Sequence, residues 1–140
     1  MISASLTGCN YSFYKGKLPY GSLNITGIEN ASYYSDLTEK MDGFLYEIIP
    51  AYSGMEIDRS SGNTLSVFIE SYNRNPYNYN EAGNILDYRY SFSARFSVND
   101  STVPVNVSKL LDADISEPAA KDSVVTESIR NFIDKLRSEF

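Results

Sequence analysis

The pattern of apolar and polar residues is clearest between Leu65 and Val98, where it predicts one long β-hairpin. In the second arm apolar and aromatic residues alternate strictly with polar ones, and the apolar set is Leu86, Tyr88, Tyr90, Phe92, Ala94, Phe96 and Val98. Such alternation is typical of a strand with one buried face. If Tyr79 lies opposite Asn84, the apolar residues of both arms lie on the same side of the hairpin. Three pairs follow from this register: Leu65 with Val98, Val67 with Phe96 and Ile69 with Ala94.

The hairpin is long for a single domain, so its tip should project beyond the core. An arm of about fourteen residues spans roughly 45 Å, whereas a domain of this length has a radius of gyration of about 14 Å. Residues 80–83 then form the loop, in which Gly83 can take a positive φ. The projecting part carries Tyr72, Tyr77, Tyr79 and Tyr88 with Arg74 and Arg89. This surface is either a binding tip or an amphipathic sheet extension whose tyrosine hydroxyls stay in water.

Two segments have helical periodicity. The first begins at Asp36 and ends before Pro50, with a capping-box variant formed by Asp36 and Glu39. Its apolar stripe is Leu37, Met41, Leu45, Ile48 and Ile49. The second begins near Pro118. Its core-facing stripe is Val125, Ile129, Phe132, Ile133 and Leu136.

Shorter strands complete the predicted fold. Residues 23–28 and 55–57 flank the first helix, which favours a parallel crossover, and Pro104 assigns residues 103–107 to an edge strand. We therefore predict the α+β class, as a two-layer sandwich. A mixed sheet of about four strands contains the long central hairpin, and two helices pack on one face.

Composition narrows the possible functions. The net charge is −6 and the sequence pI is about 4.6, so nucleic-acid binding is not expected. The chain has no histidine and one cysteine, which excludes a histidine-based triad, a thiolate or imidazole zinc site and an internal disulfide. Only Asp112, Asp114 and Glu117 remain as catalytic carboxylates, and solvated charge explains such a loop cluster more simply. We expect a non-enzymatic protein without a cofactor or metal.

The N-terminal stretch has the form of a bacterial lipobox, Leu6-Thr7-Gly8-Cys9. In a lipobox the cysteine is acylated and becomes the mature N-terminus. We therefore predict that residues 1–8 are the remnant of a lipoprotein signal peptide, that Cys9 is the lipid anchor, and that residues 9–140 form one domain. The alternative is that Cys9 is an ordinary thiol.

Several short motifs, in the same order, resemble the LptE family of lipopolysaccharide-assembly lipoproteins. The resemblance covers nearly the whole chain. Its motifs are Cys9-Asn10-Tyr11-Ser12-Phe13, Leu18-Pro19, residues 69–76, residues 83–89 and Ala119-Ala120-Lys121-Asp122.

The resemblance implies a lipoprotein anchored at the periplasmic face of the outer membrane. Such a protein plugs the β-barrel of an LptD-type partner, helps to assemble it, and binds lipopolysaccharide during its export. Cys9 would be the anchor and Lys121 a contact to lipid phosphates. An ordinary solvated lysine is the simpler interpretation of Lys121.

This sequence departs from the family pattern at the hairpin tip, where Glu81 stands in place of a basic residue. A cationic tip would then depend on Arg74 and Arg89, with Tyr77 and Tyr79 beside them as further ligand contacts. The alternative function is a generic surface lipoprotein that binds a glycan or a protein through the same sheet.

Overall fold

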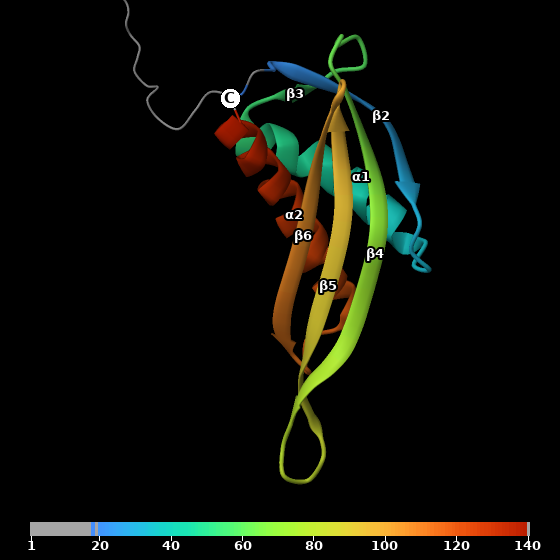
Figure 1. The fold of residues 1–140 in the computed structure, drawn as a ribbon, viewed down its shortest axis with the longest axis vertical. Coiled ribbons are helices and arrows are strands. Elements are labelled where there is room, and N and C mark those ends of the chain that lie inside the picture. Colours follow the sequence, from blue (N-terminus) through green and yellow to red (C-terminus); the bar gives the residue numbers. More distant parts are fainter. Residues whose placement is uncertain (1–17, 19, 140) are drawn as a thin grey trace, which may run out of the picture.

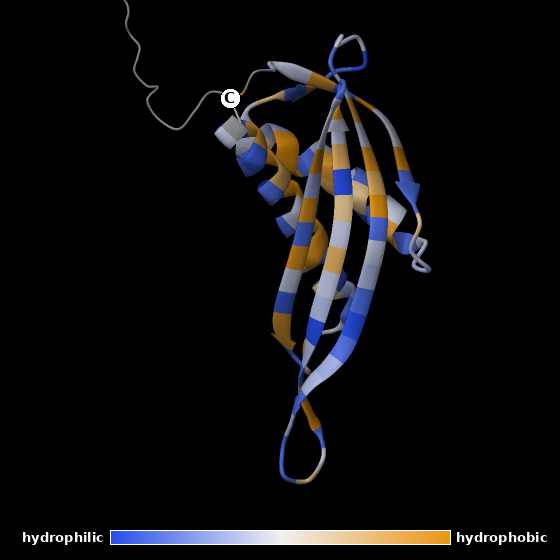
Figure 2. Cartoon of the chain, viewed as in Figure 1, coloured by the Kyte–Doolittle hydropathy of each residue, from blue (hydrophilic) through white to orange (hydrophobic). Residues whose placement is uncertain are grey.

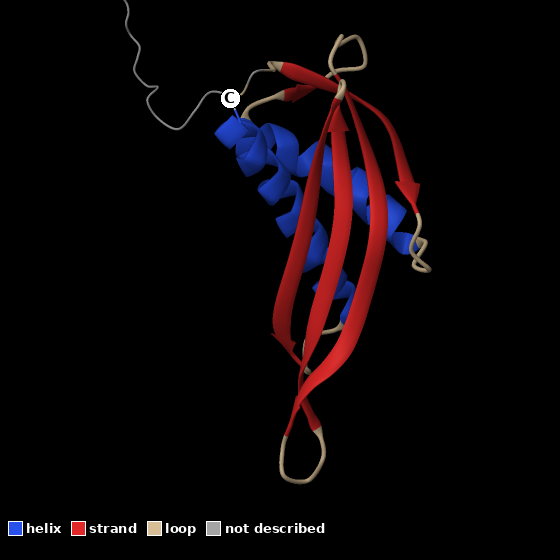
Figure 3. Cartoon of the chain, viewed as in Figure 1, coloured by secondary structure: helices blue, strands red, loops and turns tan. Residues whose placement is uncertain are grey.

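The computed structural model describes residues 18 and 20–139. The predicted signal-peptide remnant, Cys9 and the motif at residues 9–13 lie outside them. The described chain forms two layers, a five-stranded sheet with two helices on one face (Figures 1 and 3). The predicted α+β class is confirmed, with one strand more than the four expected.

The sheet has the strand order β3-β2-β4-β5-β6. The strands β4 (Thr64–Tyr79), β5 (Ile85–Val98) and β6 (Ser101–Asp112) form an antiparallel meander. The strand β2 (Ser22–Asn30) runs parallel to β4 and to the two-residue strand β3 (Glu56–Ile57). As Pro104 predicted, β6 is an edge strand.

The predicted hairpin register holds near the core. The pairs are Leu65 with Val98, Val67 with Phe96 and Ile69 with Ala94. Beyond Ile69 three irregularities shift the pairing, so Tyr79 lies opposite Ile85 and not Asn84. The predicted turn is confirmed, since the Gly83 N–H donates to the Asn80 carbonyl over 3.0 Å and Gly83 has φ +86°.

The first irregularity, at Glu70, moves Tyr72 from the predicted tip into the core. An extra residue on one strand reverses the face to which the following side chains point. Tyr72 is therefore on the helix-covered face with Ile69, and it is 4% exposed. The prediction that Tyr72 belongs to the exposed tip is wrong.

Both predicted helical stripes are buried against the sheet. The helices are α1 (Asp36–Ile48) and α2 (Glu117–Glu139), and every residue predicted for the two stripes is in the core. Phe132 of α2 stacks on Phe96 of β5, with ring centroids 4.5 Å apart. Burying each such side chain contributes about 1.5–3 kcal/mol, so these stripes hold the two layers together.

The ends of α1 differ from the prediction. Ser35 is the N-cap, and no side chain makes a capping hydrogen bond there. Pro50 does not stop the chain's helical path, because a π-helical turn, η2 (Ile49–Ser53), continues it to Gly54. Pro50 stands in the first turn of η2, where proline is tolerated.

The hairpin extends well beyond the helices (Figure 1). No residue between 73 and 89 is buried, and we call this segment the hairpin overhang. Figure 2 shows that the part of β4 that enters it is hydrophilic. The start of β2 and the end of α2 both lie toward the opposite end of the molecule (Figure 1).

Candidate functional site

The hairpin overhang brings together three of the predicted site residues. Tyr77 and Tyr79 are 49% and 57% exposed, and the guanidinium carbon of Arg89 lies 4.9 Å from the Tyr77 ring centroid. A cation over an aromatic face at this distance is held weakly, by about 0.5–1 kcal/mol at an exposed site. The tip thus exposes aromatic rings and a positive charge on its surface.

Polar contacts fix the shape of the tip. The Asp87 carboxylate accepts from the Asn78 N–H over 3.1 Å and from Asn78 Nδ2 over 2.9 Å. The Asn80 Oδ1 accepts from the N–H groups of Ala82 and Asn84, each over 2.9 Å. Because the tip has no buried residue, these bonds and the strand ladder give it its order.

Arg74 lies apart from the tip, on the helix-covered face of the sheet. Its Cζ is 3.8 Å from the Tyr88 ring centroid, and its Nε donates to the Tyr90 hydroxyl over 3.3 Å. This hydrogen bond raises the pKa of Arg74. Tyr88 and Tyr90 start a row of four tyrosines that continues through Tyr72 to Tyr34, with ring centroids 6.2, 6.4 and 4.8 Å apart.

Lys121 lies at the far end of this tyrosine row and is 11% exposed. Its Nζ donates to the two Asp36 carboxylate oxygens over 3.1 and 3.3 Å, and it lies 4.7 Å from the Tyr34 ring centroid. The Tyr72 hydroxyl donates to Glu117 Oε2 over 3.0 Å. Burial is the larger cause and this hydrogen bond the next, and both raise the pKa of Tyr72.

These contacts tie the first turn of α2 to β4 and to the first turn of α1. Sequence analysis missed the network because Lys121 and Asp36 are 85 positions apart, and no local signal links them. A role of Lys121 in lipid contact stays a prediction, but its ammonium already has an internal partner.

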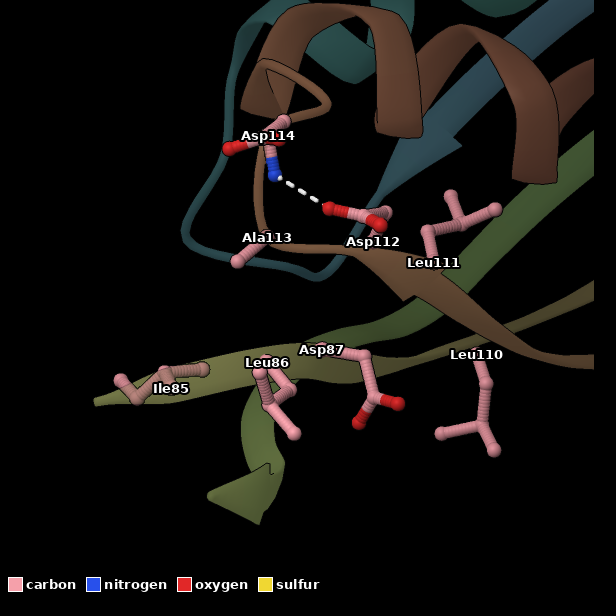
Figure 4. Close-up of a pocket in the computed structure, with 8 residues that line it drawn as sticks. All are labelled: Ile85, Leu86, Asp87, Leu110, Leu111, Asp112, Ala113 and Asp114. Atoms are coloured by element: carbon pink, nitrogen blue, oxygen red, sulfur yellow. Dashed lines mark hydrogen bonds between the residues drawn. The ribbon is translucent and has the colours of Figure 1, made fainter. Parts of the chain in front are cut away.

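A surface hollow of about 450 Å³ lies where β5, β6 and the loop after β6 meet (Figure 4). Its lining residues are Ile85, Leu86, Asp87, Leu110, Leu111, Asp112, Ala113 and Asp114. Asp112 Oδ1 accepts from the Asp114 N–H over 3.0 Å. Glu117, the third carboxylate considered for catalysis, does not line the hollow and instead accepts from Tyr72.

The outer face of the sheet carries small neutral polar residues. Its cross-strand neighbours include Ser66 with Ser97, Ser71 with Ser93, Asn73 with Ser91, Ser93 with Asn106 and Ser91 with Ser108. Ser93 Oγ donates to Asn106 Oδ1 over 2.7 Å. The charged pair on this face, Arg95 with Glu70 at 3.2 Å, neutralises itself.

The described residues contain neither a group that could hold a metal ion nor a helix that could span a membrane. No group of three or more cysteine or carboxylate side chains there could hold a metal ion. Neither α1 nor α2 combines the length and the hydrophobicity that a bilayer-spanning helix needs.

The chain matches no family model, and no curated protein matches it. Among solved structures it is similar to lipoprotein B from Nitrosomonas europaea, with a TM-score of 0.56 and 12% identity over 95% of this chain and 92% of that one. It is also similar to a PelC dodecamer subunit from Paraburkholderia phytofirmans, with a TM-score of 0.54 and 12% identity over 84% and 89% of the two chains. At such identities the likeness shows the fold, which is one that a bacterial lipoprotein adopts.

Proposed function

We propose that this chain is a non-enzymatic lipoprotein, held at the periplasmic face of the outer membrane by a lipid on Cys9. In this proposal it plugs and helps to assemble an LptD-type β-barrel, and it binds lipopolysaccharide during export to the cell surface. The hairpin overhang carries the proposal. A segment without a buried residue adds little to the stability of the domain, so its aromatic and cationic tip is better explained by a partner.

The outer face of the sheet supports the barrel partnership. The lumen of an outer-membrane barrel is polar, and a domain that enters it needs an elongated shape and flanks that form hydrogen bonds without net charge. The rows of Ser, Thr and Asn side chains on β4, β5 and β6 have this chemistry.

The cations support contact with lipopolysaccharide phosphates less directly. Arg89 is at the tip and exposed, whereas Arg74 contacts Tyr88 and Tyr90. A phosphate contact from Lys121 would require its pair with Asp36 to break or to be shared. In this proposal the tip tyrosines and Arg89 make the first contact, because among the described residues Arg89 has only its weak contact with the Tyr77 ring and forms no ion pair.

The test is co-purification from the outer membrane of the native host, using the chain with a full signal peptide and a C-terminal tag. A stoichiometric large β-barrel is the expected companion. Replacing Tyr77, Tyr79 and Arg89 together by serine should reduce the recovered barrel by at least about ten-fold, since a loss of about 1.4 kcal/mol is already ten-fold and each lost anchor costs on the order of 1–2 kcal/mol. The melting temperature should stay nearly unchanged, because all three side chains are exposed.

A matched control replaces two exposed tyrosines and one exposed arginine elsewhere, Tyr33, Tyr46 and Arg59, by serine. Equal loss of the barrel in both triple variants would contradict a specific role of the tip. Recovery of the unmodified protein alone, still in the membrane fraction, would instead support the generic surface lipoprotein. Mass spectrometry of the N-terminus and a Cys9→Ser variant test the anchor independently.

A further inference from the structure

The strand β6 forms one side edge of the sheet, and its backbone groups alternate in direction. The Ala113 N–H donates to the Leu86 carbonyl over 2.9 Å, and the β5–β6 register follows from this pair without a break. Because hydrogen-bonded and non-hydrogen-bonded pairs alternate in an antiparallel ladder, the odd-numbered residues of β6 bond to β5. The N–H and C=O groups of its even-numbered residues point away from the sheet.

One half of this edge is protected. Pro104 has no N–H to offer, and its carbonyl accepts from Lys135 Nζ over 2.7 Å. Proline and lysine at an edge are the means by which proteins prevent unwanted strand pairing.

The other half, which we call the open edge, has no proline, and its one lysine, Lys109, is turned toward α2, where its Nζ lies 3.0 Å from Glu127 and donates to Ser123 Oγ over 2.8 Å. Its outward-facing residues Asn106, Ser108 and Leu110 are exposed. In the part of the chain that the structure describes, no group accepts a hydrogen bond from the backbone N–H of any of these three. They form a template on which another extended chain can add.

The open edge leads directly into the hollow of Figure 4. Leu86 and Leu110 are about half exposed there, so they offer apolar contact surface. Asp87 and Asp112 are cross-strand partners, and together with Asp114 they line the hollow. Among the described residues, neither they nor Asp114 forms an ion pair with a lysine or arginine.

We propose that the open edge binds an extended basic peptide segment as a sixth strand. Its backbone pairs with Asn106, Ser108 and Leu110, and a lysine or arginine side chain enters the hollow. There the methylene stem lies on the leucines while the charged group faces the carboxylates of Asp87, Asp112 and Asp114. This surface is distinct from the hairpin tip, and the inference does not depend on the proposed function.

A basic peptide fits this edge better than a second copy of the chain does. Antiparallel pairing of two open edges about Ser108 would place Asp112 opposite Pro104 of the other copy. The carboxylates would then have no lysine or arginine opposite them, and the paired stretch would end at the protected half. The net charge of −6 also repels a second copy, whereas it attracts a basic segment.

The experiment measures fluorescence polarisation of a labelled peptide of about seven residues, alternating threonine and valine with a lysine at each end, added to the full chain. A peptide with glutamate in place of lysine should bind at least about ten-fold more weakly, because its charge faces the three carboxylates. A lysine peptide N-methylated at every internal amide keeps its charge but has no internal N–H group to pair on either edge, so it should not bind. Equal binding of the N-methylated peptide would reduce the effect to non-specific charge attraction and overturn the proposal.

Variants of the chain locate the contact. Ser108→Pro removes one outward N–H, and Pro104 shows that this strand accepts proline at such a position. We expect it to weaken binding by about ten-fold, while Ser108→Ala, which keeps the N–H, stays within about two-fold. The Asp87→Asn and Asp112→Asn double variant should narrow the difference between the lysine and glutamate peptides.

Hydrogen exchange and light scattering test the proposal independently of these variants. If the melting temperature of Ser108→Pro is much lower than that of Ser108→Ala, the Ser108→Pro test is replaced by hydrogen exchange of the unmodified chain. Peptide binding should then slow exchange at the amides of Asn106, Ser108 and Leu110. Unchanged exchange there, or a dimer in light scattering that the peptide does not displace, would overturn the proposal.

Discussion

Tyr72 shows how one side chain joins three elements. Its ring packs edge-on against Tyr34 at 4.8 Å, and its hydroxyl reaches Glu117 in the first turn of α2. Lys121 lies one helical turn further along α2 and 5.6 Å from the same ring. A buried tyrosine with a satisfied hydroxyl combines apolar contact and a charge-assisted hydrogen bond.

Replacing Tyr72 by phenylalanine should lower the free energy of unfolding by about 1–2 kcal/mol at pH 7. The substitution keeps the ring contacts but removes a hydrogen bond to a carboxylate, and the loss is measured by denaturant unfolding. The exposed Tyr79→Phe serves as the matched control and should change the free energy by less than about 0.5 kcal/mol. Equal effects of the two substitutions would show that the hydroxyl contact is unimportant.

The same contact predicts a pH dependence. Burial raises the folded-state pKa of Tyr72 above the unfolded value of about 10, so the neutral phenol is favoured in the folded protein. Its contribution is fully present below pH 10 and declines as the pH rises above that value. The unmodified chain should therefore lose stability with alkaline pH more steeply than Tyr72→Phe. Parallel curves in denaturant titrations between pH 9 and pH 11 would contradict this.

At the scale of elements, turns and bulges decide which side chains reach each surface. The bulge at Glu70 changes the phase of β4 and places Tyr72 inside, while the neighbouring strand β5 keeps its apolar alternation. Three turns hold a residue with positive φ: Asn99 between β5 and β6, and two glycines, Gly54 after η2 and Gly83 in the hairpin loop. They differ in what they connect.

Alanine substitutions at these two glycines should have different consequences. No heavy atom would contact an added Cβ at either position, so backbone strain alone acts, at about 1–2 kcal/mol. Gly54 joins buried Ile49 to buried Met55, so Gly54→Ala should lower the global free energy of unfolding by that amount. Gly83→Ala should instead speed amide exchange only in the hairpin overhang, because that segment opens separately from the core. A global loss from Gly83→Ala would show that the overhang is coupled to the core.

The sequence predicted the elements that have a strong period. Both helical stripes, the hairpin register near the core, the turn at residues 80–83 and the edge position of Pro104 agree with the structure. The bulges were not predictable from composition. An inserted residue leaves the residue types of a strand unchanged and alters only the face of the sheet to which the following side chains point. The false cap at Asp36 has a similar cause, since the carboxylate bonds to Lys121 from a distant part of the chain.

The candidate site was predicted in part. Tyr77, Tyr79 and Arg89 do share the tip, because their place in the hairpin follows from local pairing. Arg74 and Lys121 do not join them, because the bulge and the packing of α2 turn both toward the tyrosine row. The open edge and the hollow also needed the three-dimensional structure, since they arise where β5, β6 and a loop meet.

At the scale of the molecule, the buried core residues and the projecting residues occupy different stretches of the hairpin. Every buried residue of β4 and β5 lies between the helices and the sheet, and none lies between residues 73 and 89. Stability and the proposed binding therefore depend on different parts of the same two strands.

Replacing residues 76–88 by Asn-Gly, which joins Asn75 directly to its hydrogen-bonded cross-strand partner Arg89, should leave the domain folded. The melting temperature should change by no more than about 4 °C, since no buried side chain is removed. Co-purification of the barrel should be lost. A folded variant that retains the barrel would place the interface elsewhere, and the sheet's outer face would be the next surface to mutate.

The position of the two ends also has a mechanical consequence. The start of β2 and the end of α2 both lie toward the end of the molecule remote from the hairpin tip (Figure 1). A force applied to these two ends therefore acts first on β2 and α2. We expect these two elements to unfold before the β4–β5–β6 meander, and the hairpin tip to be the last part that the force reaches.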